Sequence, residues 1–337
     1  YCIYNEQKTA EEYQQFIAAL PLGSRTGLKT MQAEVEARVK HRSVRVYFGI
    51  KNESVTGNYL TESNNAEVCF DGRGVENSKY CDHITLGRIK DCRDYYLWGN
   101  QSELMYETVI CGEGDYNVKF CLQCWPACSN LEYCISCHSS DSCFGSVGIK
   151  KGRYVILNKQ YRESEYNQLK ARLIDHMKQT GEYGEFFPMH MSPYAYNESD
   201  AGIEYAPLSK PAVLQRGWRW EDELPGTFNR QTITQTAIPD AIKDCTAALA
   251  KELLECTRCK KNYKILKQEI AFYQKMTVPV PELCWLCSLQ EHFKRLPGYT
   301  LYSRHCGRCK KAISTPYAES RTERVLCQEC YQLEWLS

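Results

Sequence analysis

A short repeat of aromatic, aliphatic and cysteine positions runs through the middle of the chain and predicts its main fold. A repeat this short cannot contain two helices, but it fits a β-solenoid, in which stacked turns share one continuous core. Small Cys, Ser and Asn side chains suit such a core because neighbouring turns lie only about 4.8 Å apart. We therefore predict a Cys-rich β-solenoid over residues 44–158, with an irregular β-sandwich as the alternative. The repeating pairs recur every 9 to 15 residues and are Val68-Cys69, Tyr80-Cys81, Asp91-Cys92, Met105-Tyr106, Phe120-Cys121, Tyr133-Cys134, Ser142-Cys143 and Tyr154-Val155.

Helical periodicity begins soon after the predicted last turn. Because a solenoid ends in a turn with no neighbour, a helix with one apolar face is a suitable cap. Prolines are frequent between residues 181 and 240. We predict a capping helix and a loop-rich wrap over residues 159–245, and a helix from Asp240 to Leu254 that leads into the C-terminal region. The apolar positions of the capping helix are Tyr166, Leu169, Leu173, Ile174 and Met177.

The N-terminus repeats the same arrangement. The segment Tyr1-Cys2-Ile3-Tyr4-Asn5-Glu6-Gln7 is similar to the segment from Tyr154 to Gln160, and a helical apolar pattern follows it. We interpret residues 1–43 as a copy of a last turn and its capping helix, connected to the solenoid by a second helix near Leu28 to His41. The match also predicts that solenoid turns of this first copy precede Tyr1.

Composition and charge narrow the functional classes. The 337 residues suffice for two or three domains, and they contain 20 cysteines. No apolar run approaches the ~18 residues of a membrane span, so we expect no membrane contact and a cytoplasmic protein whose thiols stay reduced or bind metal. The formal net charge is +1, but residues 251–337 hold 15 Lys/Arg and 9 Asp/Glu, and residues 44–158 hold 11 and 14. A polyanionic partner would therefore meet the C-terminal region.

Four Cys-x-x-Cys pairs near the C-terminus have the spacing of metal sites. Two thiolates on a tight knuckle bind one zinc ion at about 2.3 Å, and a second knuckle completes a four-sulfur shell. The intervals of 24 residues between the first two pairs and 17 between the last two suit such sites. The pairs are Cys256/Cys259, Cys284/Cys287, Cys306/Cys309 and Cys327/Cys330.

We predict two structural zinc ions, each held by two adjacent pairs. The first belongs to a zinc module over residues 246–300 and the second to a zinc module over residues 301–337. Cross-braced pairing, in which the first pair joins the third and the second joins the fourth, is one alternative. A set of disulfides is the other alternative, although four successive spacings of this kind are unusual in disulfide frameworks.

Landmarks around the first two pairs carry a resemblance to a known family. They are Cys256-Thr257-Arg258-Cys259, Glu269, Phe272, Tyr273, Pro279, Pro281 and Cys284-Trp285-Leu286-Cys287. In this order they resemble the "probable zinc-binding" ribbon family, although Ser288 stands where that family usually has Arg. Over almost its whole length the chain is similar to a group of uncharacterised cysteine-rich proteins from uncultivated bacteria. That group has no established activity, so the resemblance implies zinc binding and no particular function.

Two further sets of residues are candidate sites. Cys121, Cys124, Cys134 and Cys137 form two pairs with nine residues between them, which allows a third zinc; buried thiols of stacked turns are the alternative. Carboxylates and His190 in the stretch 182–200 are groups used in acid and base catalysis. We prefer the interpretation that aromatic residues fix this loop to the β-surface while the charges face water. The sequence contains no nucleophile elbow, phosphate loop or dinucleotide-binding glycine motif.

The sequence therefore predicts a mixed β and α fold: a Cys-rich β-solenoid with capping helices, followed by tandem treble-clef or zinc-ribbon modules. We expect a zinc-dependent binding protein whose C-terminal modules contact nucleic acid. A protein-interaction or self-association scaffold with purely structural zinc is the alternative, and an enzyme with a site near residues 182–200 is the third possibility. The residues expected to contact phosphates are Arg258, Lys260, Lys261, Lys264, Arg304, Arg308, Lys310 and Lys311.

Overall fold

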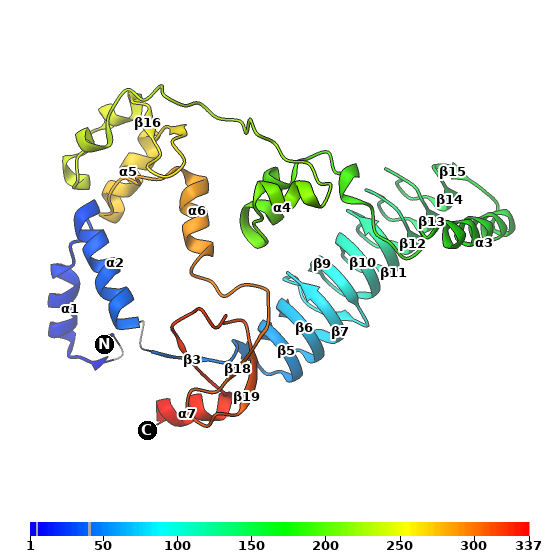
Figure 1. Ribbon diagram of the computed structural model, residues 1–337, viewed down its shortest axis with the longest axis horizontal. Helices are drawn as coiled ribbons and strands as arrows, with labels where there is room; N and C mark the ends of the chain where they lie inside the picture. The colour runs from blue at the N-terminus through cyan, green and yellow to red at the C-terminus, as the bar shows by residue number, and fades with distance from the viewer. Residues whose placement is uncertain (5, 40–41, 337) are drawn as a thin grey trace. The chain divides into compact units, whose positions relative to one another are not determined.

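The computed structural model describes residues 1–4, 6–39 and 42–336. Its internal contacts divide the chain into two compact units (Figure 1). The first unit consists of Tyr1–Arg42, Tyr196–Leu208 and Trp220–Leu296, and the second of Ser43–Ala195, Ser209–Arg219 and Pro297–Ser337. The wrap expected over residues 159–245 is thus divided between the units, and the regions predicted as zinc modules, 246–300 and 301–337, lie mainly in different units.

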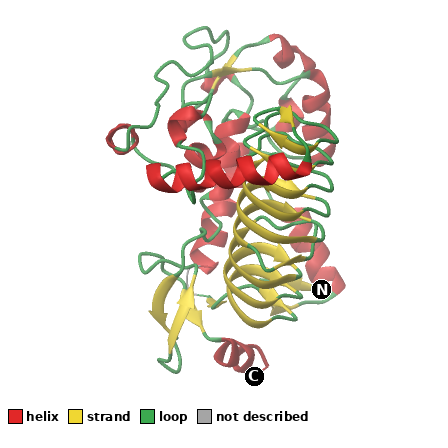
Figure 2. Ribbon diagram, turned by 90° about the vertical axis from the view of Figure 1, so that its right-hand side faces the viewer, coloured by secondary structure: helices red, strands yellow, loops and turns green. Residues whose placement is uncertain are grey.

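A twelve-stranded sheet of stacked turns forms the centre of the second unit (Figure 2). Each strand pairs in parallel with strands of the adjoining turns, and only the last pair, β14 with β15, is antiparallel. This is the topology of a β-solenoid, so the predicted architecture is confirmed and the sandwich alternative is wrong. The strands are β4 (Gly49–Ile50), β5 (Glu53–Thr61), β6 (Asn64–Arg73), β7 (Val75–Asp82), β8 (Ile89–Lys90), β9 (Arg93–Gly99), β10 (Ser102–Gly112), β11 (Tyr116–Leu122), β12 (Ser129–Glu132), β13 (Asp141–Phe144), β14 (Arg153–Ile156) and β15 (Lys159–Gln160).

The turns are built mainly from sides of three residues. Leu131, Cys134, Cys137 and Ser140 are the buried residues of four successive sides, and Cys143 begins the next turn, where it pairs with Leu131. Two residues after most inward positions the backbone has positive φ, as at Tyr133 and Ser136, with φ of 54° and 52°. The left-handed conformation turns the chain by one corner, so every third side chain points into the core. Sides of three residues are too short for the alternation that marks ordinary strands.

Cysteines supply much of the solenoid core. All ten between Cys69 and Cys143 are buried free thiols, which confirms the predicted burial of the repeat cysteines. Several thiols donate to a backbone carbonyl of the next turn, for example Cys81 to Cys92 over 3.6 Å and Cys137 to Ser146 over 3.4 Å. A small, polarizable side chain with a weak donor suits this narrow interior because it fills space and uses carbonyl acceptors of the next turn.

Helix α3 (Glu163–Thr180) covers the last turn of the solenoid, as predicted (Figure 2). Its Tyr166 is buried against Phe144 of β13 and Ile156 of β14. Lys170 also pairs with the buried carboxylate of Glu132 over 2.9 Å. Gly181 ends the helix with φ of 77°, a left-handed conformation that glycine adopts without strain.

The first turn of the solenoid is covered by the C-terminal residues of the same unit. Strand β20 (Arg324–Leu326) pairs in parallel with β3 (Ser43–Arg45), directly before the solenoid begins. The hydroxyl of Thr315 in β19 (Ala312–Thr315) donates to the Val46 carbonyl over 2.8 Å. Buried Val46, Tyr317 and Val325 form the contact. The unit also contains β18 (Tyr302–His305), α7 (Gln328–Leu336), η1 (Met189–Met191) and α4 (Lys210–Gln215).

The first unit is a smaller assembly of helices and two-residue strands. Its core comprises Ile238, Ile242, Leu249, Leu254, Ile265 and neighbouring apolar residues. The helix predicted from Asp240 to Leu254 is wrong: the segment forms two short 3₁₀ turns, η5 (Ile242–Asp244) and η6 (Ala247–Lys251). Thr246 interrupts the helical path because it is extended and its hydroxyl accepts from the Ala248 amide.

The remaining elements of the first unit include both predicted N-terminal helices, and residues 40–41 of the second prediction lie outside the described residues. The remaining elements are β1 (Cys2–Ile3), β2 (Glu6–Gln7), α1 (Ala10–Ala19), α2 (Arg25–Val39), η2 (Tyr196–Glu198), η3 (Ala201–Tyr205), η4 (Gln235–Ala237), β16 (Leu254–Glu255), β17 (Asn262–Tyr263), α5 (Lys267–Met276) and α6 (Trp285–Phe293).

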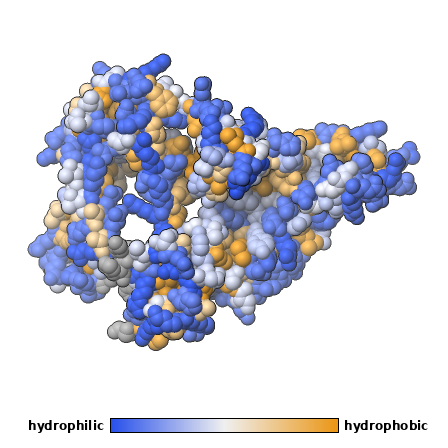
Figure 3. Space-filling view, in the orientation of Figure 1, coloured by the Kyte–Doolittle hydropathy of each residue, from blue (hydrophilic) through white to orange (hydrophobic). Residues whose placement is uncertain are grey.

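Among the described residues, no helix is long and apolar enough to cross a membrane. The visible face of the molecule is mainly hydrophilic, with hydrophobic residues scattered over it (Figure 3).

Candidate metal centres

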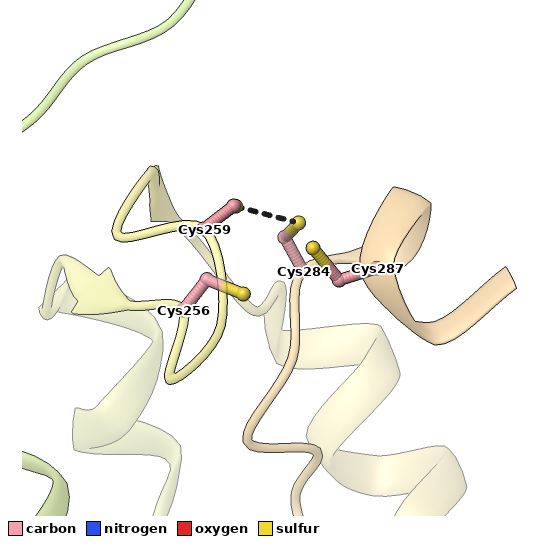
Figure 4. Close-up of side chains that lie close together, drawn as sticks. All are labelled: Cys256, Cys259, Cys284 and Cys287. Carbon is pink, nitrogen blue, oxygen red and sulfur yellow. Dashed lines mark hydrogen bonds between the residues drawn. The ribbon is translucent and has the colours of Figure 1, made fainter. Parts of the chain in front are cut away.

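The first two cysteine pairs converge in the first unit (Figure 4). Cys256 and Cys259 lie on a tight turn after β16, where the Cys256 amide donates to the Lys261 carbonyl and the Lys260 amide donates to the Cys256 carbonyl. Cys284 is the N-cap of α6, and Cys287 lies in the first turn of that helix. A knuckle and a helix N-terminus thus present two thiols each to one point.

The last two pairs form the same arrangement in the second unit. The Cys306 amide donates to Lys311 over 2.9 Å and the Lys310 amide to Cys306 over 3.1 Å, the same two distances as at the equivalent bonds of the first knuckle. Lys260 and Lys310, which follow the second cysteine of each knuckle, have φ of 64° and 65°. Cys327 precedes α7, and Cys330 lies in its first turn. The two knuckles are therefore structural copies.

The donor geometry fits a tetrahedral ion in both centres. In each group the four sulfur atoms lie within 4.8 Å of one another. A zinc ion with four sulfurs at 2.3 Å requires sulfur–sulfur distances of about 3.8 Å. The separations of Cys259 from Cys284, 3.7 Å, and of Cys309 from Cys327, 3.8 Å, match this requirement. Adjacent pairs share a centre, so the cross-braced alternative is wrong, and the thiols are not disulfides.

Backbone amides prepare one thiol of each group for metal binding. Burial raises the pKa of Cys256, but amides of Cys259, Cys284 and Arg258 outweigh this effect and lower it to about 6. In the second centre burial likewise opposes the amides around Cys306, and the amides lower its pKa to about 6. A metal ligand must be a thiolate, so each centre has a first ligand that is ionised at neutral pH.

The basic residues near the knuckles are mostly engaged within their own units. Arg258 pairs with Glu291 and donates to Gln290, and Lys260 pairs with Glu255 over 3.3 Å. Two others bond to backbone: Lys261 donates to the Pro225 carbonyl over 2.9 Å, and Arg304 donates to the carbonyls of Tyr317, Ala318 and Glu323. The side chains of the set that are exposed, with no polar partner among the described residues, are Lys264, Arg308, Lys310 and Lys311.

The four solenoid cysteines considered for a third metal do not converge. Cys121, Cys124, Cys134 and Cys137 are absent from the groups of described residues whose ligand atoms lie within 4.8 Å of one another. They lie on successive sides of neighbouring turns, where the Cys124 thiol donates to the Cys134 carbonyl over 3.5 Å and the Cys134 amide donates to the Cys121 sulfur over 3.3 Å. Thiols of Cys121 and Cys137 lower the pKa of Cys134 to about 5, whereas burial and neighbouring thiols raise the pKa of Cys121. The structure brings these thiols together as a ladder, not as a tetrahedron.

The sequence did not predict one cluster of possible metal-ligand side chains. Asp71, Asp82 and His83 bring their ligand atoms within 4.8 Å of one another on two neighbouring turns. The Asp82 carboxylate lies 2.9 Å from His83 Nδ1 and, with Asp71, raises the pKa of the His83 ring, while burial raises the pKa of Asp71. The Tyr299 hydroxyl lies 3.4 Å from His83 Nε2, and its ring packs on Phe70. The cluster therefore ties the segment after Pro297 to the solenoid. No sequence motif predicts this cluster, because the stacking of two turns brings Asp71 to His83.

The stretch considered for catalysis is divided between the two units after Ala195. In the second unit, rings of Tyr183 and Phe187 pack on Tyr133, and the Gly184 amide donates to the Tyr133 hydroxyl over 2.9 Å. These contacts support the interpretation that aromatic residues fix the loop to the β-surface. Of the carboxylates in this stretch, Glu182 accepts a hydrogen bond from Thr180 over 2.8 Å.

Comparison with known protein families and with curated proteins finds no match to this chain.

Proposed function

We propose that this protein is a zinc-dependent binding scaffold, in which a β-solenoid presents the binding surface and two zinc ions maintain its supporting modules. The observation that carries the proposal is the position of the second cysteine centre. Its strand β20 pairs with β3, and its Thr315 binds Val46, so the module is built onto the first turn of the solenoid. A metal at this place supports the end of the repeat.

Zinc is the ion that best suits both centres. Four thiolates form a closed shell with no position for water or substrate, which is the arrangement of structural zinc sites. The buried cluster around the second centre consists of Cys306, Leu326, Cys327 and Cys330, so cysteines are most of its core. So small an apolar core leaves the metal as the main source of stability. We assign the knuckle-and-helix modules to the treble-clef type of zinc fold.

The contacts that the basic side chains make within their own units favour a protein partner over nucleic acid. Four of the eight residues expected at phosphates bind groups of their own unit instead. The solenoid surface, in contrast, exposes aromatic side chains, including Tyr80 and Tyr116 with 48% of each residue accessible. Exposed tyrosines are enriched at protein interfaces because their rings give contact area at low conformational cost.

Nucleic-acid binding stays as the second candidate because of Arg308, Lys310 and Lys311. All three are exposed on the second knuckle, where they can contact phosphates. They also offset the negative charge of a zinc ion with four thiolates, which needs no partner.

A binding measurement separates these candidates. Fluorescence anisotropy of labelled single- and double-stranded nucleic acid is recorded with the zinc-loaded chain at several salt concentrations. The scaffold proposal predicts no steep salt dependence and no difference between the wild type and an R308Q/K310Q/K311Q variant. Affinity that falls linearly with log salt, and is lost in the variant, would replace the scaffold with the nucleic-acid candidate.

A further inference from the structure

The hairpin at the N-terminus has the same backbone as the hairpin that ends the solenoid. Strands β1 and β2 pair Cys2 with Gln7 and Ile3 with Glu6, and β14 and β15 pair Val155 with Gln160 and Ile156 with Lys159. Each of the four residues of the first hairpin has its equivalent 153 positions later in the second. The bond from the Lys8 amide to the Tyr1 carbonyl, 3.0 Å, has its counterpart in the bond from Tyr161 to Tyr154, 2.9 Å.

The helices after these hairpins also correspond. Glu12 accepts from the Thr9 amide at the start of α1, and Glu165 accepts from the Arg162 amide at the start of α3. The ring of Tyr1 packs on Tyr13 at 5.3 Å, and its equivalent Tyr154 packs on Tyr166 at 5.6 Å. Nine of the twenty residues at 1–20 are identical to those at 154–173. Residues 1–20 are therefore a second copy of the solenoid cap.

The two copies differ in what covers them. In the second copy β13 pairs with the free edge of β14, and Val155, Ile156 and Tyr166 are 4%, 1% and 3% exposed. Among the described residues of the first copy, β1 pairs with β2 alone and α1 has no buried residue. The same surface that meets a solenoid turn at one site is open at the other.

The second copy indicates what occupies this surface. Pairs of successive turns join residues 11 to 14 positions apart in one chain, from Glu53 with Asn64 to Val75 with Ile89. A cap of this kind is thus entered directly from the turn that it covers. The solenoid of a second copy of the chain offers no free end, because α3 covers its last turn and the β20 module covers its first.

We propose that residues 1–20 are built to cap the last turn of a β-solenoid, and that they receive a turn leading directly into Tyr1 as the second copy receives the turn leading into Tyr154. The inference rests on the internal match of the two caps and is independent of metal binding. In this register Cys2 takes the place of Val155, stacked in the core on the inward residue of the preceding turn.

A fusion tests the proposal on the full chain. A copy of residues 102–153 is placed directly before Tyr1, so that the copied Arg153 leads into Tyr1 as Arg153 leads into Tyr154. Alkylation of Cys2, followed by peptide mass spectrometry, is expected to slow by roughly tenfold or more relative to the unfused chain, because labelling then requires local opening. The matched control carries one extra alanine before Tyr1, which moves Cys2 off the inward position and should restore fast labelling. Equal rates in the two fusions would overturn the proposal.

A second experiment tests the proposal even if the added turns of the fusion do not fold, because it transplants the first cap onto the existing solenoid. Residues 1–20 replace residues 154–173 in the full chain, and hydrogen exchange of the β13 amides is measured. Protection within several-fold of the wild type supports the proposal, and an I3D version of the exchange should lose it. Protection no better than in the I3D version would contradict it. Dimerisation of the unaltered chain that is abolished by Ile3→Asp would assign the edge to a second copy and also overturn the proposal.

Discussion

Cys121 and Cys124 in the solenoid have the same spacing as Cys256 and Cys259 in the first metal centre, yet their thiols serve different purposes. In the solenoid the left-handed residue is Gln123, inside the pair, and it turns the chain so that the two thiols lie on successive sides. In the knuckle the left-handed residue is Lys260, after the pair, and both thiols face one point. The position of a single left-handed residue decides which structure forms.

The electrostatic surroundings of the thiols differ as well. Burial raises the pKa values of Cys92, Cys128 and Cys143 in the solenoid to about 12. Backbone amides outweigh burial at Cys256 and Cys306 and lower the pKa of each to about 6. At neutral pH Cys92, Cys128 and Cys143 are neutral parts of an apolar core, whereas Cys256 and Cys306 are thiolates suited to a cation. Cys134 differs from these three solenoid thiols because neighbouring thiols lower its pKa.

The largest expected effect comes from removing one ligand of the second centre. Cys327→Ser should release one zinc ion and, with it, metal-linked folding free energy on the order of 10 kcal/mol. Because this module covers the first solenoid turn, hydrogen exchange should accelerate in β3 and β20. Cys2→Ser, at an exposed cysteine outside both centres, is the matched control and should keep two zinc ions and normal exchange. Unchanged protection of β3 after zinc loss would show that the metal does not support the first turn of the solenoid.

A charge introduced in the solenoid core should have the next largest effect. Cys92 is fully buried. Cys92→Arg places an unpaired cation in a narrow apolar interior and should destabilise the solenoid by roughly 3–5 kcal/mol. Cys92→Ala should cost much less, and both variants should retain two zinc ions. Denaturant unfolding and elemental analysis provide the measurements. Loss of zinc from Cys92→Ala would show that solenoid thiols contribute to metal binding.

The solenoid and the metal centres should respond to pH in opposite directions. Burial raises the pKa of Asp115 to about 7, although the amides of Cys128 and Gly112 donate to its two oxygens over 2.8 Å and oppose the rise. The folded state thus holds this proton more tightly than the unfolded state, whose pKa is about 3.9. The contribution of Asp115 to stability falls as pH rises from about 4 to about 7, by up to roughly 4 kcal/mol.

Comparison with Asp115→Asn isolates this effect, because the amide does not ionise. The difference between the denaturation midpoints of wild type and variant should change across that pH range, whereas zinc loss in acid affects both proteins equally. A constant difference would indicate that Asp115 has an ordinary pKa in the folded state.

The smallest effect is expected at the second knuckle. R308Q/K310Q/K311Q removes three exposed charges and leaves every thiol, so stability should change by less than about 0.5 kcal/mol and zinc content should stay at two. Elemental analysis and thermal unfolding test this outcome. Loss of zinc from the variant would mean that these charges stabilise the thiolate centre.

The sequence predicted the solenoid and both metal centres for physical reasons that are visible in single residues. Inward residues such as Cys69 and Cys81 repeat once per turn, and the four Cys-x-x-Cys pairs record their metal geometry directly in their spacing. The three-residue sides were missed because inward positions include Ser140 and Asp115 as well as apolar residues, so polarity does not reveal the period. Corner positions are also occupied by residues such as Tyr133, which give no turn signal.

Other features depend on contacts that a linear pattern does not contain. Asp71 meets His83 only because two turns stack, and Arg304 is committed to carbonyls that other segments supply. The pairing of β20 with β3 joins residues about 280 positions apart, from Arg324 to Ser43. The helix predicted from Asp240 to Leu254 shows the remaining difficulty: it did not form, because the Thr246 hydroxyl bonds to the backbone and so competes with the helix.

The central claim is that eight C-terminal cysteines bind metal and the ten solenoid cysteines do not. The direct test is the zinc content of the reduced, zinc-saturated chain, measured together with the cysteines that become reactive when a chelator removes the metal. The account predicts two zinc ions per chain and release of reactivity at Cys256, Cys259, Cys284, Cys287, Cys306, Cys309, Cys327 and Cys330. Fewer than two ions, or a third ion whose removal exposes Cys121, Cys124, Cys134 and Cys137, would contradict it.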